Sequence, residues 1–481
     1  MEIISLRNEH ISFNFSNLLI KQSNMNRLVK ASIFVSLSLM VTSCGLYKKY
    51  EMPDQTAITS EFKKVMEEKP DSTSLPYLSW EQVFTDPTLH NLIRTAITNN
   101  RNLDNARLNI EIARAQLKGA KLSYYPSLTF APNGGGSSIG GSDMGWSYQL
   151  PLAANWEVDA FGKLLNSKRS AEVAVEQSEY ARQSVQSQIV CSVASCYYSL
   201  VLLNQQLDLS VRTAEIWKEQ VESMELMKAA ARVNEAAVVQ SRANYYSILA
   251  SIPDLRQQID VLQNTLSLLL NTYPQKFTVT SELNFNLPVQ IADGVPVAYL
   301  AARPDVHAAE RQMAIAYYAT NRARANFYPS LNISATGGFT NLLGSMISNP
   351  GKWFINLAGQ LTAPLFSRGQ NISTLLAAQA QQKQAMNTFE TTVLSAAADV
   401  ADAMVQIRTS DEKRKYVLLQ IDQLQKSVEY TQELLTMGKA TYLEVLTAQS
   451  SLLNAQMTSL ACWHSKVAAI ISLYQSVGGG R

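Results

Sequence analysis

The stretch that decides the fold is residues 146–158, WSYQLPLAANWEV, in which apolar side chains alternate with polar or small ones. The apolar series consists of Trp146, Tyr148, Leu150, Leu152, Ala154, Trp156 and Val158. A period of two residues predicts a β-strand with one apolar face. Thirteen residues span about 43 Å, so a strand tilted by about 40° still crosses an apolar band of about 25 Å. Aromatic residues near both ends of this face are typical of membrane strands.

A second stretch repeats the pattern in residues 353–365, WFINLAGQLTAPL, where Trp353 corresponds to Tyr148. A half-buried strand of a soluble protein would give the same alternation. Its recurrence about 205 residues later favours two membrane strands. We therefore predict a lipid-facing surface made of Trp146, Tyr148, Leu150, Leu152, Trp156, Trp353, Ile355, Leu357 and Leu361.

The whole chain follows one plan twice. SYYPSL at 123–128 recurs as NFYPSL at 326–331, and Phe161 of DAFGK recurs as Phe366 of PLFSRG. Each half reads as helix, strand pair, very long helix, turn and long helix. We place the first repeat at 86–285, with its strand pair at about 125–159, and the second at 286–481, with its strand pair at about 328–366. The segments 133–145 and 336–352 are predicted to be exposed connecting loops.

Four strands cannot close a barrel. An open sheet edge in lipid leaves backbone groups without hydrogen bonds, and the smallest known membrane barrels have eight strands. The protein must therefore form oligomers. Two copies would give eight strands and a filled interior, whereas three copies would give twelve strands and a lumen. If the barrel conducts solutes, it needs a lumen, which favours three copies.

The helical segments are unusually long. From Lys163 to about Ala231 there is no proline or glycine, and the same holds between Asn371 and Met437. A helix of nearly seventy residues reaches about 100 Å, far more than a globular domain needs. Apolar residues at alternating spacings of four and three predict coiled-coil packing. Pro253 is predicted to interrupt the return helix of the first half, and Pro304 to stand near a helix start.

Composition argues against several functions. Lysine and arginine number 41 against 39 acidic residues, so the chain lacks the basic footprint of a nucleic-acid-binding protein. It contains no HExxH, GxSxG or GxxxxGK[ST] motif, and its histidines are scattered, so we predict no enzyme and no cofactor. Cys191, Cys196 and Cys462 lack metal-site spacing and are predicted to be buried packing residues.

Residues 25–44, MNRLVKASIFVSLSLMVTSC, read as a secretory signal. The apolar run is about half the roughly 20 residues of a membrane helix. Its end, VTSC, resembles a bacterial lipobox, which would place diacylglyceryl and N-acyl groups on Cys44; an ordinary cleavage site is the alternative. We predict that translation begins at Met25, that 1–43 is the signal region, and that 44–85 is a lipidated linker. Gly45 follows Cys44, at the position where an aspartate marks lipoproteins for retention in the inner membrane. The absence of that aspartate favours the outer membrane.

Further motifs are RPDVHAAE at 303–310, GKATYLEVLTAQSSLLNAQ at 438–456 and LYQSVGGG at 473–480. With the preceding ones, they make the mature chain similar to the TolC-type outer-membrane factor family, in its OprM-like, NodT-type lipoprotein branch. The resemblance implies a mainly α fold with transmembrane β-strands. Three protomers, each contributing four strands, would form a 12-stranded outer-membrane barrel above a long coiled-coil helical barrel. It also implies two partners, a periplasmic adaptor and an inner-membrane transporter, with passive conduction of drugs or other small molecules.

The resemblance further implies a periplasmic aperture near the helix turn at Gly438. Glu444 falls on an acidic position of the family, whereas Thr447 stands where a second acid would be expected, which puts a double acidic ring in doubt. Three Glu444 carboxylates in a narrow pore would favour cations; a solvated surface acid is the alternative. Two other functions stay open, namely a surface lipoprotein that binds nutrients or glycans, and the same channel serving protein or heavy-metal export.

Overall fold

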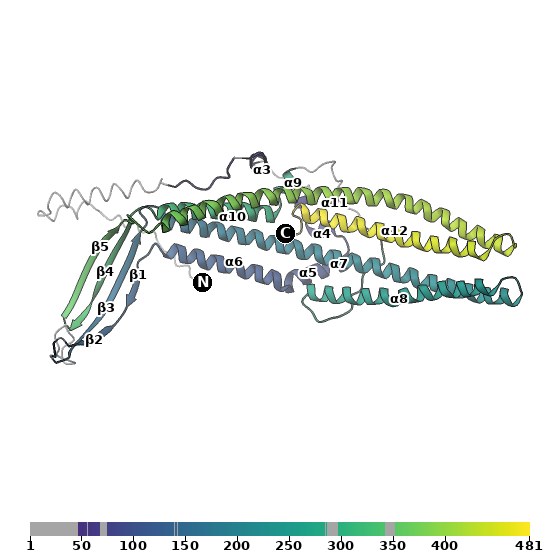
Figure 1. Cartoon of the computed structure of the whole chain (residues 1–481), viewed down its shortest axis with the longest axis horizontal. Helices are drawn as coiled ribbons and strands as arrows, with labels where there is room; N and C mark the ends of the chain where they lie inside the picture. Colours follow the sequence, from purple (N-terminus) through teal and green to yellow (C-terminus); the bar gives the residue numbers. More distant parts are fainter. Residues whose placement is uncertain are drawn as a thin grey trace, which may run out of the picture. The chain divides into compact units, whose positions relative to one another are not determined.

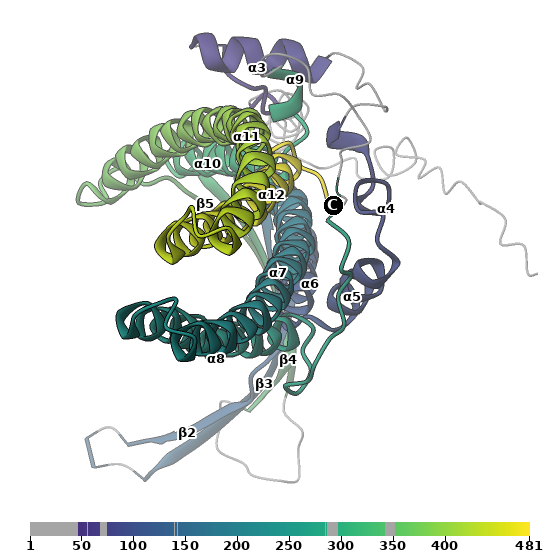
Figure 2. The same ribbon diagram turned by 90° about the vertical axis from the view of Figure 1, so that its right-hand side faces the viewer.

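The computed structural model describes residues 47–54, 56–67, 75–138, 140, 141, 143–283, 285, 297–341 and 352–481. These fall into two compact units. The sheet unit comprises, within the described ranges, 122–167 and 321–375, with the preceding segment up to Lys49. The helical unit comprises 50–121, 168–320 and 376–481. Figures 1 and 2 show the elements of both units.

The sheet unit contains an antiparallel sheet (Figure 1). Its strands are β1 (Ser127–Phe130), β2 (Asn133–Ser137), β3 (Gly145–Val158), β4 (Ser330–Asn341) and β5 (Lys352–Thr362). β1 and β2 both pair with β3, which pairs with β4, which pairs with β5. The predicted hairpins are therefore present, but the outer strand of the first hairpin is divided into β1 and β2, which pair with β3 in one register and together occupy one of four strand positions. Pro132 lies between β1 and β2, where its missing N–H interrupts the edge strand.

Three predicted boundaries were wrong. Residues 133–137 were assigned to a loop but form β2, and 336–341 were assigned to a loop but continue β4. Backbone groups pair with β3 whatever the side chain, so the ladder outweighs the low strand propensity of glycine. β5 ends at Thr362, earlier than the alternation suggested. Pro364 lies two residues further on and has no N–H to donate.

The long helices occur in pairs of equal length. α6 (Arg101–Leu122) and α10 (Pro304–Ala325) have 22 residues each. α7 (Lys163–Ala229) and α11 (Gln370–Thr436) have 67 each, and α8 (Glu235–Leu269) and α12 (Tyr442–Ser476) have 35 each. The shorter elements are α3 (Ala57–Glu67), η2 (Leu75–Tyr77), α4 (Trp80–Val83), α5 (Pro87–Asn99) and α9 (Val297–Leu300).

Of the two proline predictions, one is confirmed and one was wrong. Pro304 is the first residue of α10, where its missing N–H has no helical partner to lose. Pro253, however, lies inside an unbroken α8. It removes one helical hydrogen bond, but Ile248 and Ile252 beside it are buried against Trp217 of α7. This packing keeps the helix continuous through the proline.

The main core lies in the helical unit, where the largest fully buried side chains include Tyr197, Tyr474 and Phe389. α7 contains an 18-residue window of mean hydropathy 1.3, and 61% of that window is buried inside the protein, as in a core helix. Tyr474 also explains one of the glycines that follow it, Gly479. A Cβ atom on Gly479 would stand 2.2 Å from the Tyr474 ring. The predicted burial of Cys191, Cys196 and Cys462 is confirmed, and all three are free thiols.

Candidate membrane face and hairpin tips

One face of the sheet is almost entirely apolar. Residues paired directly across neighbouring strands point to the same face, so the register assigns every side chain. The large apolar members of this face are Leu128, Phe130, Trp146, Tyr148, Leu150, Leu152, Trp156, Leu331, Ile333, Phe339, Trp353, Ile355, Leu357 and Leu361. All nine predicted lipid-facing residues lie here. Eight are exposed, with Trp353 at 72% and Leu357 at 73%, and Tyr148 is half-buried.

The opposite face is mostly polar or small, with Phe354 as its large apolar member. Its members include Thr129, Ser147, Gln149, Asn155, Asn332, Ser334, Thr336, Asn356 and Gln360. An antiparallel sheet in a water-soluble protein packs its apolar face on a core and exposes the polar face. In this sheet the apolar face is exposed as well, with no core packed against it. An exposed apolar patch of this size requires a partner or a lipid environment.

The sheet has two open edges. Within the described part of the chain, β5 pairs only with β4, and β1 and β2 pair only with β3. Their outward N–H and C=O groups would be left without hydrogen bonds in an apolar phase, at several kcal/mol per group. A membrane location of this sheet therefore requires that both edges be paired.

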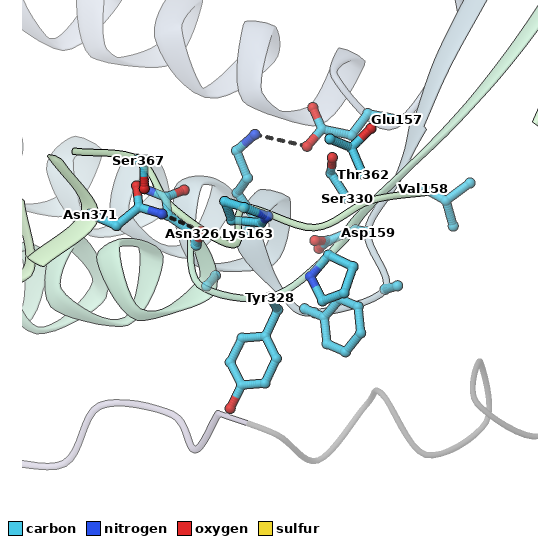
Figure 3. A pocket seen from close by; sticks show the side chains of 15 residues that line it. Glu157, Val158, Asp159, Lys163, Asn326, Tyr328, Ser330, Thr362, Ser367 and Asn371 are labelled. Carbon is cyan, nitrogen blue, oxygen red and sulfur yellow. Dashed lines mark hydrogen bonds and ion pairs between the residues drawn. The ribbon is translucent and has the colours of Figure 1, made fainter. Parts of the chain in front are cut away.

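A small cavity of about 290 Å³ lies where the strands lead into the long helices (Figure 3). Lys163 Nζ lies 2.8 Å from Glu157 Oε1, and Asn371 Nδ2 donates to the Asn326 carbonyl at 3.0 Å. The carboxylate of Asp159 accepts hydrogen bonds from the first N–H groups of α7, at Leu164 and Leu165. These bonds cap α7 and hold the strand ends in place. The residues that line the cavity therefore support the junction between the strands and the long helices.

The two helical hairpins turn in the same way. Ala231 and Gly438, 207 residues apart, both have positive φ angles of 59° and 70°. In each turn the next N–H closes the helix end, from Arg232 to the Met227 carbonyl at 2.9 Å and from Lys439 to the Leu434 carbonyl at 2.8 Å. Gly438 therefore lies in the turn between α11 and α12, at the position where glycine adopts the left-handed conformation without strain.

The tips of the two hairpins contact each other. Met224 and Val238 from the first hairpin are buried with Tyr442 and Leu446 from the second. The Tyr442 hydroxyl lies 2.8 Å from Ser241 Oγ, and burial raises the pKa of Tyr442. Our reading of the sequence did not find this pair, because nothing in the local pattern joins residues 201 positions apart. The only local signal was Tyr442 inside the GKATYLEV motif.

Glu444 and Thr447 are both exposed on the first turns of α12. Glu444 Oε1 accepts a hydrogen bond from Thr441 Oγ1 at 3.1 Å, and Thr447 Oγ1 donates to the Leu443 carbonyl at 2.8 Å. Both side chains are thus available at the helix start, and their role in an aperture stays a prediction. Cys44 lies outside the described residues.

The RPDVHAAE motif proves to be a packing motif. Arg303 Nη2 bonds Asp305 at 2.7 Å, and its Nη1 donates to the Ser476 carbonyl at 2.9 Å. His307 is buried and stacks on Tyr180 with ring centroids 4.6 Å apart, and burial lowers its pKa. Burial raises the pKa of Glu310. The prediction that the histidines are packing or surface residues is thereby confirmed for His307.

Sequence comparisons with known proteins identify similar outer-membrane proteins. The family model described as outer membrane efflux protein matches residues 92–272 and 295–479. The probable outer membrane lipoprotein SilC of Salmonella typhimurium is 30% identical over 410 residues, covering 83% of this chain and 88% of that protein. The cation efflux system protein CusC of Escherichia coli (strain K12) is 27% identical over 454 residues, covering 92% and 98%.

The solved structures agree. A crystal structure of CusC, described in connection with folding and transmembrane channel formation, superposes with a TM-score of 0.80 at 25% identity, covering 90% of this chain and 98% of that one. The outer membrane protein VceC of Vibrio cholerae superposes with a TM-score of 0.77 at 21% identity, covering 84% and 99%. At that identity the likeness shows a shared fold.

Proposed function

The chain belongs to the outer membrane efflux protein family, and from this premise we propose that three copies close a 12-stranded barrel in the outer membrane. The protein is an outer-membrane efflux channel. The single observation that carries the proposal is the exposed apolar face of the sheet, bounded by two open edges. Three copies pair every edge and leave a lumen lined by the polar face.

The helices supply the rest of the proposed channel. Two hairpins per copy, built on helices of 67 and 35 residues, would give a tunnel wall of coiled-coil type about 100 Å long. Its periplasmic end would be the pair of tips at Ala231 and Gly438, with Glu444 near the aperture. A periplasmic adaptor and an inner-membrane transporter would deliver the cargo there. Conduction is passive, and the protein belongs to a family of channels instead of enzymes.

We assign the membrane tether to Cys44, carrying diacylglyceryl and N-acyl groups. The lipobox-like VTSC supports this assignment, as does a relative named a lipoprotein. Two or more acyl chains anchor a protein stably, whereas one is marginal. A nutrient-binding or glycan-binding surface lipoprotein would share the anchor but would have no need of a bare apolar sheet face.

The decisive test is the mass and extraction of a Cys44→Ala form. As a channel, this form stays trimeric by native mass measurement and still requires detergent, because the barrel spans the membrane without the anchor. A Cys44→Ala form that is monomeric and freely soluble in buffer would exclude the channel.

A second candidate concerns the cargo. Relatives at 27% to 28% identity over 92% of this chain are named as cation efflux proteins. A relative named for pyoverdine export is 28% identical over 85% of the chain, and those named for solvent or toluene efflux are 26% identical. From the greater coverage at this identity we propose metal cations as the cargo. Deleting the gene should then lower resistance to silver or copper salts and leave resistance to organic solvents unchanged. A loss confined to organic compounds would reverse this choice.

A further inference from the structure

The pairing of β3 with β4, called the seam below, joins the two halves of the chain. It indicates how the edge strands of two copies would pair. Its last pair is Val158 opposite Leu331. Three residues further on, in the same register, the Phe161 ring stacks on Tyr328, with ring centroids 5.1 Å apart and planes 12° apart. Both rings lie where the strands lead into the helices, so the stack extends the β3–β4 pairing at its helical end.

The residues equivalent to Phe161 and Tyr328 lie beside the two outer edges of the sheet. Tyr125 begins the same YPSL sequence as Tyr328, and Phe366 follows β5 as Phe161 follows β3. Neither ring is covered within the chain, since Tyr125 is 70% exposed and Phe366 is 87% exposed. The unpaired edges beside them also match in length, because 127–137 and 352–362 both span eleven residues.

We propose that β5 of one copy pairs with β1 and β2 of the next copy in a single register, with Phe366 stacked on the neighbouring copy's Tyr125. In this register Thr362 lies opposite Thr129 of the neighbour, and Leu361 lies opposite its Phe130. The seam between copies then repeats the seam within the chain. The inference rests on the proposed function, which supplies the oligomer.

The proposed register is compatible with a closed barrel. Stepping across the sheet from Ser127 through paired residues leads to Asn155, Ser334 and Ala358. The proposed register continues from Ala358 to the neighbour's Asn133, six residues along from the starting position. Three copies accumulate a stagger of about 18 residues, which tilts twelve strands by roughly 46°, at the upper limit of the usual range.

The two nearest alternatives keep the apolar face outward but shift the pairing by two residues. The shift that increases the stagger gives a tilt of roughly 54°, outside the usual 35–45°. The opposite shift gives roughly 35° but places Phe366 opposite Ser123 instead of Tyr125. The barrel tilt therefore excludes the larger stagger, and the stack of Phe366 on Tyr125 favours the proposed register over the smaller one.

The helices offer a matching contact. Inside the chain, Gln177 Nε2 of α7 donates to Gln312 Oε1 of α10 at 2.8 Å. The equivalent positions are Gln384 of α11 and Asn109 of α6, at the offsets that relate the paired helices. Both are exposed in the single chain. Two amide side chains can form the same hydrogen bond between copies.

The test is oxidative crosslinking of the full chain in native outer membranes. Thr362→Cys is combined with Thr129→Cys for the proposed register, and with Ser127→Cys or Ala131→Cys for the two shifted ones. Glu157→Cys with Asn332→Cys is the benchmark inside the chain, since these residues are paired. A disulfide requires Cα atoms within about 7 Å, and diagonal neighbours lie at roughly 7–8 Å.

We expect dimers and trimers from the Thr129 and Thr362 pair, forming at least about tenfold faster than from either shifted pair, because only directly opposed residues meet the distance limit. The benchmark should close without forming dimers. Neighbouring pairs alternate in hydrogen-bonding class. Phe130→Cys with Leu361→Cys, benchmarked by Trp156→Cys with Ile333→Cys, therefore covers the case in which the first benchmark does not close.

The outcomes separate the two levels of inference. Faster crosslinking of a shifted pair, or none in a protein whose native mass is a trimer and whose benchmark closes, overturns the register and leaves the trimer intact. A native mass of one chain, with no crosslink between copies, overturns the proposed function itself.

Discussion

Replacing Leu357 by arginine tests whether the exposed sheet face meets lipid. Leu357 is the sixth of the eleven residues of β5, on the apolar face and 73% exposed. With a tilt of roughly 46°, five residues on either side place it about 12 Å from each end of the strand, near the middle of an apolar band of about 25 Å. An arginine at the midplane of a membrane barrel costs about 2–4 kcal/mol.

The matched control is the adjacent residue, Asn356→Arg, which points to the polar face. In the lumen its charge stays hydrated, so we expect a loss below about 1 kcal/mol. Leu357→Arg should lose about 2–4 kcal/mol per chain, or about 6–12 kcal/mol per trimer, since each copy contributes one site. If the face were exposed to water, both substitutions would have small and similar effects.

The assay is guanidinium-induced unfolding of the protein inserted in phospholipid vesicles, followed by tryptophan fluorescence and extrapolated to zero denaturant. A stability of Leu357→Arg that equals that of Asn356→Arg would refute the lipid-facing assignment. The same result would remove the main physical reason for oligomerisation.

Three further predictions concern the helical unit. Glu444→Gln should reduce the preference for cations over anions in single-channel recordings, since it removes three carboxylates from the proposed aperture; unchanged selectivity would exclude Glu444 from it. Tyr442→Phe should destabilise the contact between hairpins by about 1–3 kcal/mol, because Ser241 Oγ loses its partner in a buried site. Faster amide exchange in 224–246 and 435–446 would report this loss, and adding Ser241→Ala should recover part of it. Burial lowers the pKa of His307, so its contribution to stability is present above its unfolded pKa of about 6.5 and is lost as pH falls through the folded value. His307→Phe keeps the ring on Tyr180 and should flatten the decline in thermal stability between about pH 7 and pH 5; an unchanged slope would assign the decline to other groups.

Much of the fold could be predicted from local patterns. The alternation in 146–158 sets the apolar face of β3, because a period of two leaves no other arrangement of side chains. The absence of proline and glycine after Lys163 predicts a helix of nearly seventy residues, and α7 has 67. Of the candidate site, the nine apolar residues were predictable for the same reason. A mostly polar second face then follows without any long-range information, whereas the number of open edges depends on the pairing of β3 with β4.

Other features depended on contacts between distant residues. Pro253 carries a local signal for a helix break, yet buried Ile248 and Ile252 hold α8 together. The glycines of 133–137 carry a local signal for a loop, yet hydrogen bonds to β3 make them a strand.

The sequence by itself determined the strand faces, the helix lengths and the repeated plan, since each follows from the covalent order and the periodicity of side chains. Only the tertiary structure decided the register of β3 on β4, the stack of Phe161 on Tyr328 and the contact between Ser241 and Tyr442. These join residues more than 150 positions apart, and their energies depend on packing that no local pattern encodes. The same packing leaves Phe366 and Tyr125 exposed and thereby indicates how a second copy binds.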